Sequence, residues 1–259
     1  MLTSLFHTLK NPDSFWREVF RHGLLAKHRT PADWFLFRHE VSRECAMRRR
    51  DPEGGPIRQL IEEIFPDISK VQSQVKLVRP NAYNLSWAEI ITVSQLVSML
   101  SPRTLFEFGT FDGKTTLHLA LNSPKDAIVY TIDKERGTFD FGTDRSFFGK
   151  VSVGECFLST PVEKKICLLT GNTRQFDFTP FIRKVDFTFV DADHSYEGVM
   201  NDSERAFDII RPGGLIVWHD YLLIGDVTKA IVDICKNKDL RHLKGTSLVI
   251  CREPSETGK

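Results

Sequence analysis

The chain has 259 residues, of which 41% are hydrophobic and 27% charged, and this composition excludes a disordered, collagen-like or coiled-coil protein. Lysine and arginine together number 35 against 34 aspartates and glutamates, so nucleic acid is not the expected partner. The length allows one large domain, or one domain with an appendage.

The first 80 residues predict a small helical cap. Aromatic and aliphatic side chains recur there at helical spacing in three segments: 12–24, 31–49 and 56–64. We divide the chain accordingly into a cap, residues 1–80, and a larger domain, residues 81–259. Because the apolar faces of the cap must be buried somewhere, we expect them to cover a substrate site and to contribute to a homodimer.

From about residue 85 onward, short β-branched runs alternate with helical patterns, which predicts βαβ units in a doubly wound α/β domain. We expect strands at 104–108, 127–132, 166–170, 185–190, 214–218 and 247–251. We expect helices at 114–121, 195–210 and 226–236, beginning at the Gly113 turn and at the N-caps Ser195 and Asp226. Residues 135–165 form a longer connection and are predicted to be an insertion near the active site.

The first of these strands leads directly into the glycine-containing turn EFGTFDG, residues 107–113. Where a strand, a turn and a helix N-terminus meet, backbone N–H groups face a ligand, and a side chain at Gly109 or Gly113 would block its approach. The spacing is one residue too short for a Walker A loop, and residues 110–111 interrupt the dinucleotide pattern GxGxxG. The turn therefore disfavours ATP and NAD as ligands.

Polar residues also follow the next two strands. Asp133 ends the second strand, where a carboxylate can accept both ribose hydroxyl hydrogens, and Asn172 follows the third. Either side chain could instead simply cap a turn. Together with the glycine turn, they indicate a nucleoside site at the carboxyl ends of adjacent strands.

Charged residues gather at the ends of the last two parallel strands. The fourth strand is followed by Asp191, Asp193 and His194, and the fifth by His219 and Asp220. An apolar strand cannot bury such groups cheaply, so we expect them to share a solvated or metal-bearing cleft.

The pattern ExGxxxG at 107–113, with DADHSYEGV at 191–199 and RPGGLIVWHDY at 211–221, resembles the class I S-adenosylmethionine-dependent methyltransferases. The resemblance spans roughly residues 85–252 and is to the small-molecule and sugar O-methyltransferases related to the catechol O-methyltransferase-like enzymes. It implies a Rossmann-like, mostly parallel sheet of seven strands, and transfer of a methyl group from S-adenosylmethionine to a small-molecule hydroxyl. The cofactor-binding residues that it implies are Glu107, Gly109, Thr110, Gly113, Asp133, Asn172 and Asp191.

The same resemblance implies a divalent metal ion at Asp191, His219 and Asp220. Mg²⁺ prefers oxygen ligands, which suits the two aspartates, whereas His219 shifts the preference toward Mn²⁺, Fe²⁺ or Zn²⁺. Alternatively, His219 orients Asp220 from outside the metal's ligands, or only bonds to a loop backbone. Asp191 and His194 are the implied catalytic residues, with His194 as general base; the alternative is that His194 caps the helix beginning near Ser195.

Cysteine usage and hydropathy predict a cytoplasmic protein with no membrane partner. The five cysteines are odd in number and include no CxxC pair, and no run approaches 18 apolar residues. The leading hypothesis is an O-methyltransferase acting on a small-molecule acceptor, whose hydroxyl can belong to a sugar, polyketide, phenol or peptide. The alternative is a non-catalytic nucleoside-binding module acting through its N-terminal helices, but such a binder has no need for the charged strand ends.

Overall fold

The structure, a computed structural model, describes residues 41, 43–47, 49–78, 83–134 and 151–255. Its strands are β1 (Ile57–Gln59), β2 (Thr104–Phe108), β3 (Ile128–Asp133), β4 (Ile166–Thr170), β5 (Val185–Val190), β6 (Ile210–Trp218), β7 (Arg241–Leu243) and β8 (Val249–Arg252). Its labelled α-helices are α4 (Ile61–Ile64), α5 (Trp87–Leu100), α6 (Lys114–Asn122), α8 (Tyr196–Ile209) and α9 (Gly225–Cys235). Short 3₁₀ turns lie at Ile68–Lys70, Glu163–Lys165 and Thr179–Phe181.

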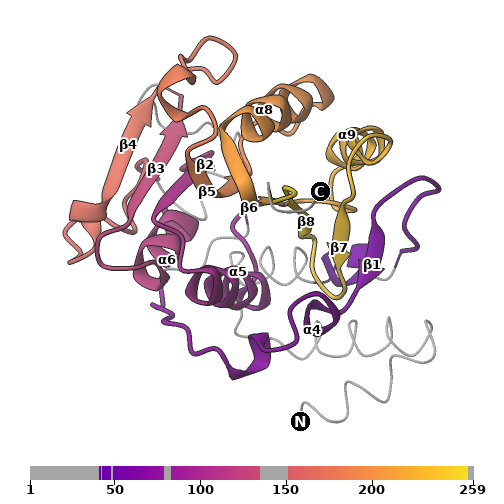
Figure 1. Ribbon diagram of the computed structural model, residues 1–259, viewed down its shortest axis with the longest axis horizontal. Helices are drawn as coiled ribbons and strands as arrows, with labels where there is room; N and C mark the ends of the chain where they lie inside the picture. Colours follow the sequence, from indigo (N-terminus) through magenta and orange to yellow (C-terminus); the bar gives the residue numbers. More distant parts are fainter. Residues whose placement is uncertain (1–40, 42, 48, 79–82, 135–150, 256–259) are drawn as a thin grey trace, which may run out of the picture.

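All eight strands form one sheet in the order β1-β7-β8-β6-β5-β2-β3-β4 (Figure 1). Within this sheet only β8 runs against its neighbours β6 and β7, and the other pairs are parallel. The chain proceeds from β2 outward through β3 and β4, and then returns to place β5 on the other side of β2. The strand order therefore reverses between β2 and β5, which is where ligands bind in open α/β sheets.

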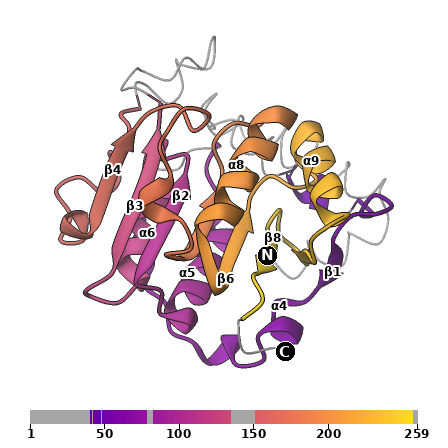
Figure 2. The same cartoon turned by 45° about the horizontal axis from the view of Figure 1, so that its top comes forward.

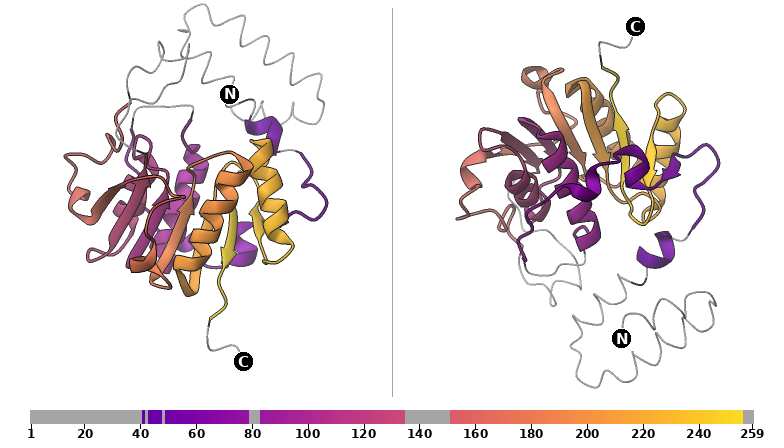
Figure 3. Two further views of the ribbon diagram at one scale, coloured as in Figure 1. Left: turned by 90° about the horizontal axis from the view of Figure 1, so that it is seen from above. Right: turned by 60° about the horizontal axis from the view of Figure 1, so that its bottom comes forward.

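Two helical layers cover the sheet. Helices α5 and α6 lie on one face and α8 and α9 on the other, as the two views of Figure 3 and the side view of Figure 2 show. The layer of α5 and α6 contributes buried residues that include Ile90, Leu96 and Leu119, packed with Leu105 and Phe187 of the strands. The strands are buried on both faces, and this explains their continuous apolar sequences.

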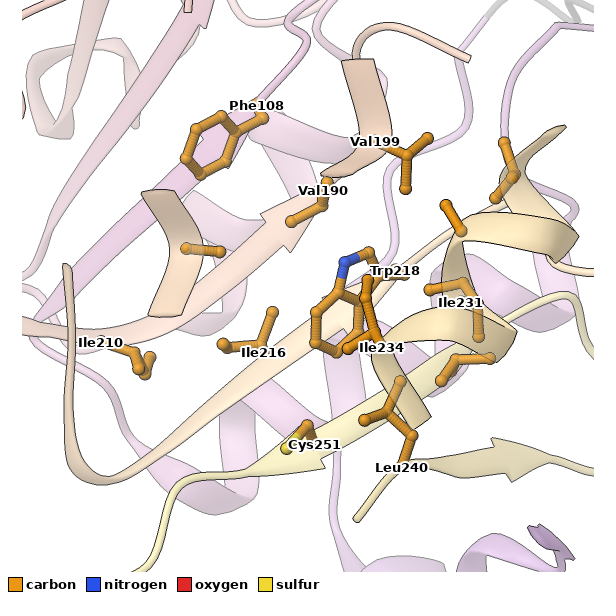
Figure 4. Close-up of a cluster of buried hydrophobic side chains, with 14 of the residues drawn as sticks. Phe108, Val190, Val199, Ile210, Ile216, Trp218, Ile231, Ile234, Leu240 and Cys251 are labelled. Atoms are coloured by element: carbon orange, nitrogen blue, oxygen red, sulfur yellow. The ribbon is translucent and has the colours of Figure 1, made fainter. Parts of the chain in front are cut away.

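The opposite layer is built around Trp218 of β6. Figure 4 shows this side chain beside Ile231 and Ile234 of α9, and its indole N–H donates to the Ser203 hydroxyl at 2.9 Å. A buried indole needs such a partner for its N–H group. Both layers thus fix the strand ends from which the site is built.

The structure confirms the six predicted strands and the three helices predicted at 114–121, 195–210 and 226–236, with shifts of a few residues at their ends, whereas α5 was not predicted. Ser195 is the N-cap of α8, and its hydroxyl accepts a hydrogen bond from the Gly198 N–H. Asp226 was wrongly predicted as an N-cap, because the N-cap of α9 is Ile224 and Asp226 lies in the first turn.

Two further predictions need correction. The sheet has eight strands rather than seven. The predicted helix at 56–64 is wrong over its first half, because residues 57–59 form β1 and only 61–64 are helical. Backbone pairing of β1 with β7 outweighs the helical spacing of its apolar residues.

The predicted helix at 12–24, most of the one at 31–49 and the first part of the 135–165 insertion lie outside the described residues. In the described part of the chain, no helix has the length and apolar character needed to cross a membrane.

Candidate active site

The turns after β2, β3, β4 and β5 border a cavity of about 470 Å³ at the carboxyl edge of the sheet. Its lining includes six of the residues that the sequence predicts for the site: Gly109, Thr110, Asp133, Asn172, Asp191 and His194. Glu107, Gly113, His219 and Asp220 lie outside this lining. The cavity sits at the reversal of strand order, where such folds bind nucleotides.

Gly109 ends β2 with a φ of +92°, a conformation that glycine adopts most readily. A Cβ at this position would stand 2.1 Å from the backbone oxygen of Asp191 and 2.9 Å from the Ala192 Cα. The turns after β2 and β5 therefore touch through their backbones, and only a residue without a side chain fits between them.

Gly113 has a different role. It is the N-cap residue of α6 with a φ of +81°, and a Cβ there would meet the ring of Phe157 at 2.6 Å. The residue lets the segment containing Gly154 and Phe157 pack against the start of the helix.

Asp133 ties the glycine turn to β3. One of its carboxylate oxygens accepts hydrogen bonds from the backbone N–H groups of Thr110 and Phe111, at 2.9 and 2.8 Å. The Thr110 hydroxyl adds a 2.7 Å hydrogen bond to Thr131. Asp133 thus holds the turn and lines the cavity at the same time, so the two interpretations of its sequence position are compatible.

Asn172 likewise stabilises a turn and lines the cavity. Its side-chain oxygen accepts a hydrogen bond from the Arg174 N–H at 3.0 Å, which stabilises the turn after β4. The residue nevertheless lines the cavity together with Thr173 and Arg174.

Glu107 lies beneath the glycine turn and is 1% exposed. Its carboxyl group accepts hydrogen bonds from the hydroxyls of Thr116 in α6 and Thr131 in β3. Burial raises the pKa of Glu107 to about 8, although the two threonine hydroxyls act in the opposite direction. The residue supports the turn from below and is neutral at pH 7.

We expect the pH dependence of stability to reveal this buried carboxyl. Because its pKa is about 8 in the folded chain and 4.5 in the unfolded chain, the stability it contributes is complete below pH 4.5 and is lost as the pH rises through 8. Glu107→Gln should therefore become more stable relative to the wild type between pH 5 and 8.5, by roughly 1.4 kcal/mol for each pH unit between pH 5 and the folded pKa. Urea unfolding at both pH values measures this difference.

Glu62→Gln, which removes an exposed carboxyl group in α4, serves as the control and should leave the pH dependence unchanged. If the Glu107→Gln and wild-type stabilities ran parallel across this pH range, the buried carboxyl would be ionised in the folded chain.

A cluster of acidic and imidazole groups lies beside the cavity. Nδ1 of His219 is 3.2 Å from an oxygen of Asp191 and 3.2 Å from an oxygen of Asp220. Nε2 of His194 is 2.9 Å from the other oxygen of Asp220 and 3.4 Å from Asp191. The ends of β5 and β6 thus meet as the sequence predicts, and Asp191 belongs to both the cavity wall and the cluster.

The backbone of this cluster is unusual at Asp220, where φ is +62°. Aspartate is among the few residues with a side chain that adopt this left-handed conformation, and such positions concentrate at functional sites.

The pKa shifts in the cluster are those of carboxylates paired with protonated imidazoles. Burial alone would raise the pKa of Asp191, but His219 and His194 hold it well below its ordinary value. Burial alone would lower the pKa of His219, yet Asp220 and Asp191 raise it well above the usual range. Hydrogen bonds to Asp191 and Asp220 raise the pKa of His194 to about 10.

The residues of the cluster fit a divalent metal ion. One potential ligand atom from each of Asp191, His219 and Asp220 lies within 4.8 Å of the others. Two carboxylates and one imidazole suit Mn²⁺, Fe²⁺ or Zn²⁺ as well as Mg²⁺. The groups facing the ring nitrogens of His219 among the described residues are carboxylates, which favours the metal-ligand interpretation over a bond to a loop backbone.

His194 is the most exposed member, with 45% of its side chain accessible. Ser195 caps α8, so the helix start does not require His194. The imidazole reaches from the cluster into the cavity wall.

Several lining residues were not predicted from the sequence: Tyr83, Asn84, Thr115, Lys134, Thr173 and Arg174; Asp193, which was expected in the cleft at the strand ends, also lines the cavity. Asp193 accepts a hydrogen bond from the Ser195 N–H at 2.9 Å, and its side chain packs on Gly198, where a Cβ would stand 2.3 Å from its Cγ. The glycine of the DADHSYEG segment, Gly198, therefore leaves the space that the Asp193 side chain occupies. Tyr83 and Asn84 precede the first predicted strand, and no sequence signal indicated them.

Comparison with known proteins finds similarity to methyltransferases. The family model described as a methyltransferase domain matches residues 106–221, from β2 to the residue after Asp220. The matched segment is thus similar to the methyltransferases that use S-adenosylmethionine. The turns after β2, β3, β4 and β5 that line the cavity lie within this segment, whereas Tyr83 and Asn84 precede it.

Curated relatives of this methyltransferase domain include two plant proteins. Caffeoyl-CoA O-methyltransferase of Populus kitakamiensis is 29% identical over 143 residues, which are 54% of this chain and 56% of that protein. Caffeoyl-CoA O-methyltransferase 2 of Zea mays is 28% identical over 137 residues, 52% of this chain and 48% of that protein. The chain thus spans about half the length of these curated relatives.

Among solved structures, the O-methyltransferase TomG from Streptomyces achromogenes, involved in tomaymycin synthesis and in complex with SAM, aligns with a TM-score of 0.48. The two proteins are 16% identical, and the alignment covers 91% of this chain and 95% of TomG.

Proposed function

We propose that the protein transfers the methyl group of S-adenosylmethionine to a hydroxyl group of a small molecule. The observation that carries this proposal is the position of Asp191, which lines the nucleoside-sized cavity and also belongs to the acidic cluster. A cofactor in the cavity and a hydroxyl at the cluster would therefore lie on either side of one residue. This arrangement is what a transfer between two bound molecules requires.

The cofactor site follows from the turns around the cavity. We infer that Asp133 binds the ribose hydroxyls, that Asn172 contacts the adenine, and that Gly109 and Thr110 allow the cofactor to approach the backbone. Glu107 and Gly113 support this site by holding the glycine turn and the start of α6 in place.

The reaction is an in-line displacement. The acceptor oxygen forms a bond to the methyl carbon while the carbon–sulfur bond breaks, and S-adenosylhomocysteine leaves with the bonding electron pair. The proton of the acceptor hydroxyl passes to the imidazole of His194, a residue that lines the cavity.

A divalent ion held by Asp191, His219 and Asp220 would supply charge that lowers the pKa of the acceptor hydroxyl and offsets the carboxylates beside His194. Without that charge the two aspartates hold His194 in its protonated form, which cannot accept a proton. The carboxylates of Asp191 and Asp220 therefore orient His194, and they keep it protonated unless a cation offsets their charge.

Methyl transfer from radiolabelled S-adenosylmethionine tests the proposal. Because the relatives are named for caffeoyl-CoA, the assay uses this compound and simpler phenols and sugars, with Mg²⁺ or Mn²⁺ present. His194→Ala should lower kcat by about 10²–10⁴-fold, the usual contribution of a general base, and leave the calorimetric affinity for S-adenosylhomocysteine unchanged.

Tyr196→Phe is the matched control, since its hydroxyl bonds to Asp233 at 2.9 Å, away from the cavity. It should transfer methyl groups at the wild-type rate. Tight S-adenosylhomocysteine binding without transfer to any acceptor would instead favour the nucleoside-binding module.

We further infer that residues 1–80 cover the acceptor site and join two copies of the chain in a homodimer that acts in the cytoplasm, without nucleic acid or membrane partners. Within this segment, β1 pairs with β7 of the larger domain, so a deletion that preserves the sheet must stop before residue 57. Sedimentation velocity should show the full chain as a dimer and a chain lacking residues 1–40 as a monomer. A full chain that sediments as a monomer would contradict the dimer.

A further inference from the structure

Glu89 of α5 is a buried carboxylate on the far side of His219 from the acidic cluster. It is 1% exposed, and one of its oxygens lies 3.6 Å from Nε2 of His219. That imidazole is itself 1% exposed at its side chain, and its Nε2 has no hydrogen-bond partner among the described residues. Glu89 is the acidic group that faces this nitrogen.

Capping of α5 does not account for the position of Glu89. It completes a capping box with Ser86, whose N–H and hydroxyl donate to one carboxylate oxygen at 2.9 and 2.8 Å. A capping glutamate ordinarily stays near solvent, because burying a carboxylate is costly without further partners. Here the same oxygen also faces His219, and Arg43 approaches it at 3.5 Å.

The other oxygen of Glu89 connects the helix to Ser247, which lies between β7 and β8. It accepts hydrogen bonds from the N–H and the hydroxyl of Ser247, at 2.8 and 2.6 Å. The carbonyl of Ser247 in turn accepts from the N–H of Tyr221, the residue after Asp220. Glu89 therefore contacts the side chain of His219 directly and the backbone beyond Asp220 through one intermediary.

The two ring nitrogens of His219 face different groups. Its Nδ1 faces the oxygens of Asp191 and Asp220 at 3.2 Å each, whereas its Nε2 faces Glu89 at 3.6 Å. A histidine that binds a metal through one nitrogen commonly donates the hydrogen on the other to a carboxylate, which fixes its tautomer and ring orientation.

We propose that Glu89 is a positioning residue for the metal site: it accepts the Nε2–H of His219 and so keeps Nδ1 directed at an ion shared with Asp191 and Asp220. This inference rests on the metal site proposed above. It extends the site to Glu89 of α5, more than 100 residues before Asp191 in the chain.

Binding of Mn²⁺ to the full chain, saturated with S-adenosylhomocysteine, tests this role without recourse to turnover. Titration calorimetry, with free Mn²⁺ counted by electron paramagnetic resonance, should show that Glu89→Gln binds the ion about 10–100-fold more weakly than the wild type. The affinity for S-adenosylhomocysteine should not change, because Glu89 does not line the cavity.

The matched control is Ser86→Ala, which removes the capping hydroxyl but leaves Glu89 facing His219. It should lower the melting temperature and keep the wild-type Mn²⁺ affinity. In a His219→Ala background, Glu89→Gln should have no further effect on Mn²⁺ binding, because the residue acts through the imidazole.

Wild-type Mn²⁺ affinity in Glu89→Gln, or an equal loss in the His219→Ala background, would overturn the inference. If Glu89→Gln fails to bind S-adenosylhomocysteine, Glu89→Asp replaces it: this variant keeps the charge but withdraws it from Nε2, and it too should weaken Mn²⁺ binding. A wild-type chain that binds no Mn²⁺ would overturn the metal site itself, which is a separate result.

Discussion

Replacing Gly109 with alanine is expected to abolish S-adenosylhomocysteine binding and to lower the free energy of unfolding by about 2–4 kcal/mol. The new Cβ would stand 2.1 Å from the Asp191 backbone oxygen, far inside van der Waals contact. Asp191 cannot withdraw easily, because its N–H donates to the Phe108 carbonyl at 2.9 Å and β2 pairs with β5 along its length. The turn that lines the cavity must move instead. Calorimetry and urea unfolding measure the two losses.

Gly245→Ala is the control that separates the effect of the steric clash from the effect of the left-handed backbone conformation. Gly245 has a similar φ of +86°, but no atom lies within 4 Å of a Cβ built on it. This variant should lose only about 1 kcal/mol of stability and bind S-adenosylhomocysteine normally. If Gly109→Ala bound S-adenosylhomocysteine normally, the contact between the turns after β2 and β5 would not shape the cofactor site.

The sequence predicts the central strands well because each is a continuous apolar run followed by a polar or glycine residue. Such runs arise when a parallel strand is buried on both faces, as Phe106 and Phe187 are here. The polar residues that follow them converge because parallel strands share one carboxyl edge. Asp133 and Asp191 could therefore be assigned to one site before their distances were known.

The edge of the sheet could not be predicted in the same way. Strand β1 has three residues, Ile57–Gln59, and its partner β7 lies more than 180 positions further along the chain. A segment of that length shows no alternation, and its pairing depends on contacts remote in sequence. The cluster of Asp51, Arg58 and His242 that accompanies this pairing is equally remote, with His242 Nδ1 at 2.8 Å from Asp51.

Glu89 illustrates what the sequence conceals about the site. In the structure it forms a capping box with Ser86, and neither this box nor helix α5 was among the predictions from the sequence. Its approach to His219 depends on how α5 packs against the end of β6, which no local pattern encodes. Residues at strand ends are thus predictable from topology, whereas the residues that support them from neighbouring helices are not.

Removal of a divalent ion should strongly reduce turnover, and Asp220→Ala should reproduce this loss. We expect EDTA and this variant each to lower methyl transfer by about 10²–10⁴-fold, because a bound cation stabilises the transition state by several kcal/mol and each 1.4 kcal/mol is a factor of ten. Affinity for S-adenosylhomocysteine should persist in both cases, since Asp220 does not line the cavity. Added Mn²⁺ or Mg²⁺ should restore the chelated wild type but not the variant.

Asp226→Ala provides the matched control, because Asp226 is an exposed carboxylate in the first turn of α9, six residues after Asp220. It should retain full turnover and the same response to EDTA. The melting temperature of Asp220→Ala must also be measured, since alanine tolerates the φ of +62° less well than aspartate. Full activity in EDTA would leave His194 as the sole activator of the acceptor hydroxyl, and the cluster of carboxylates would then serve only to orient that imidazole.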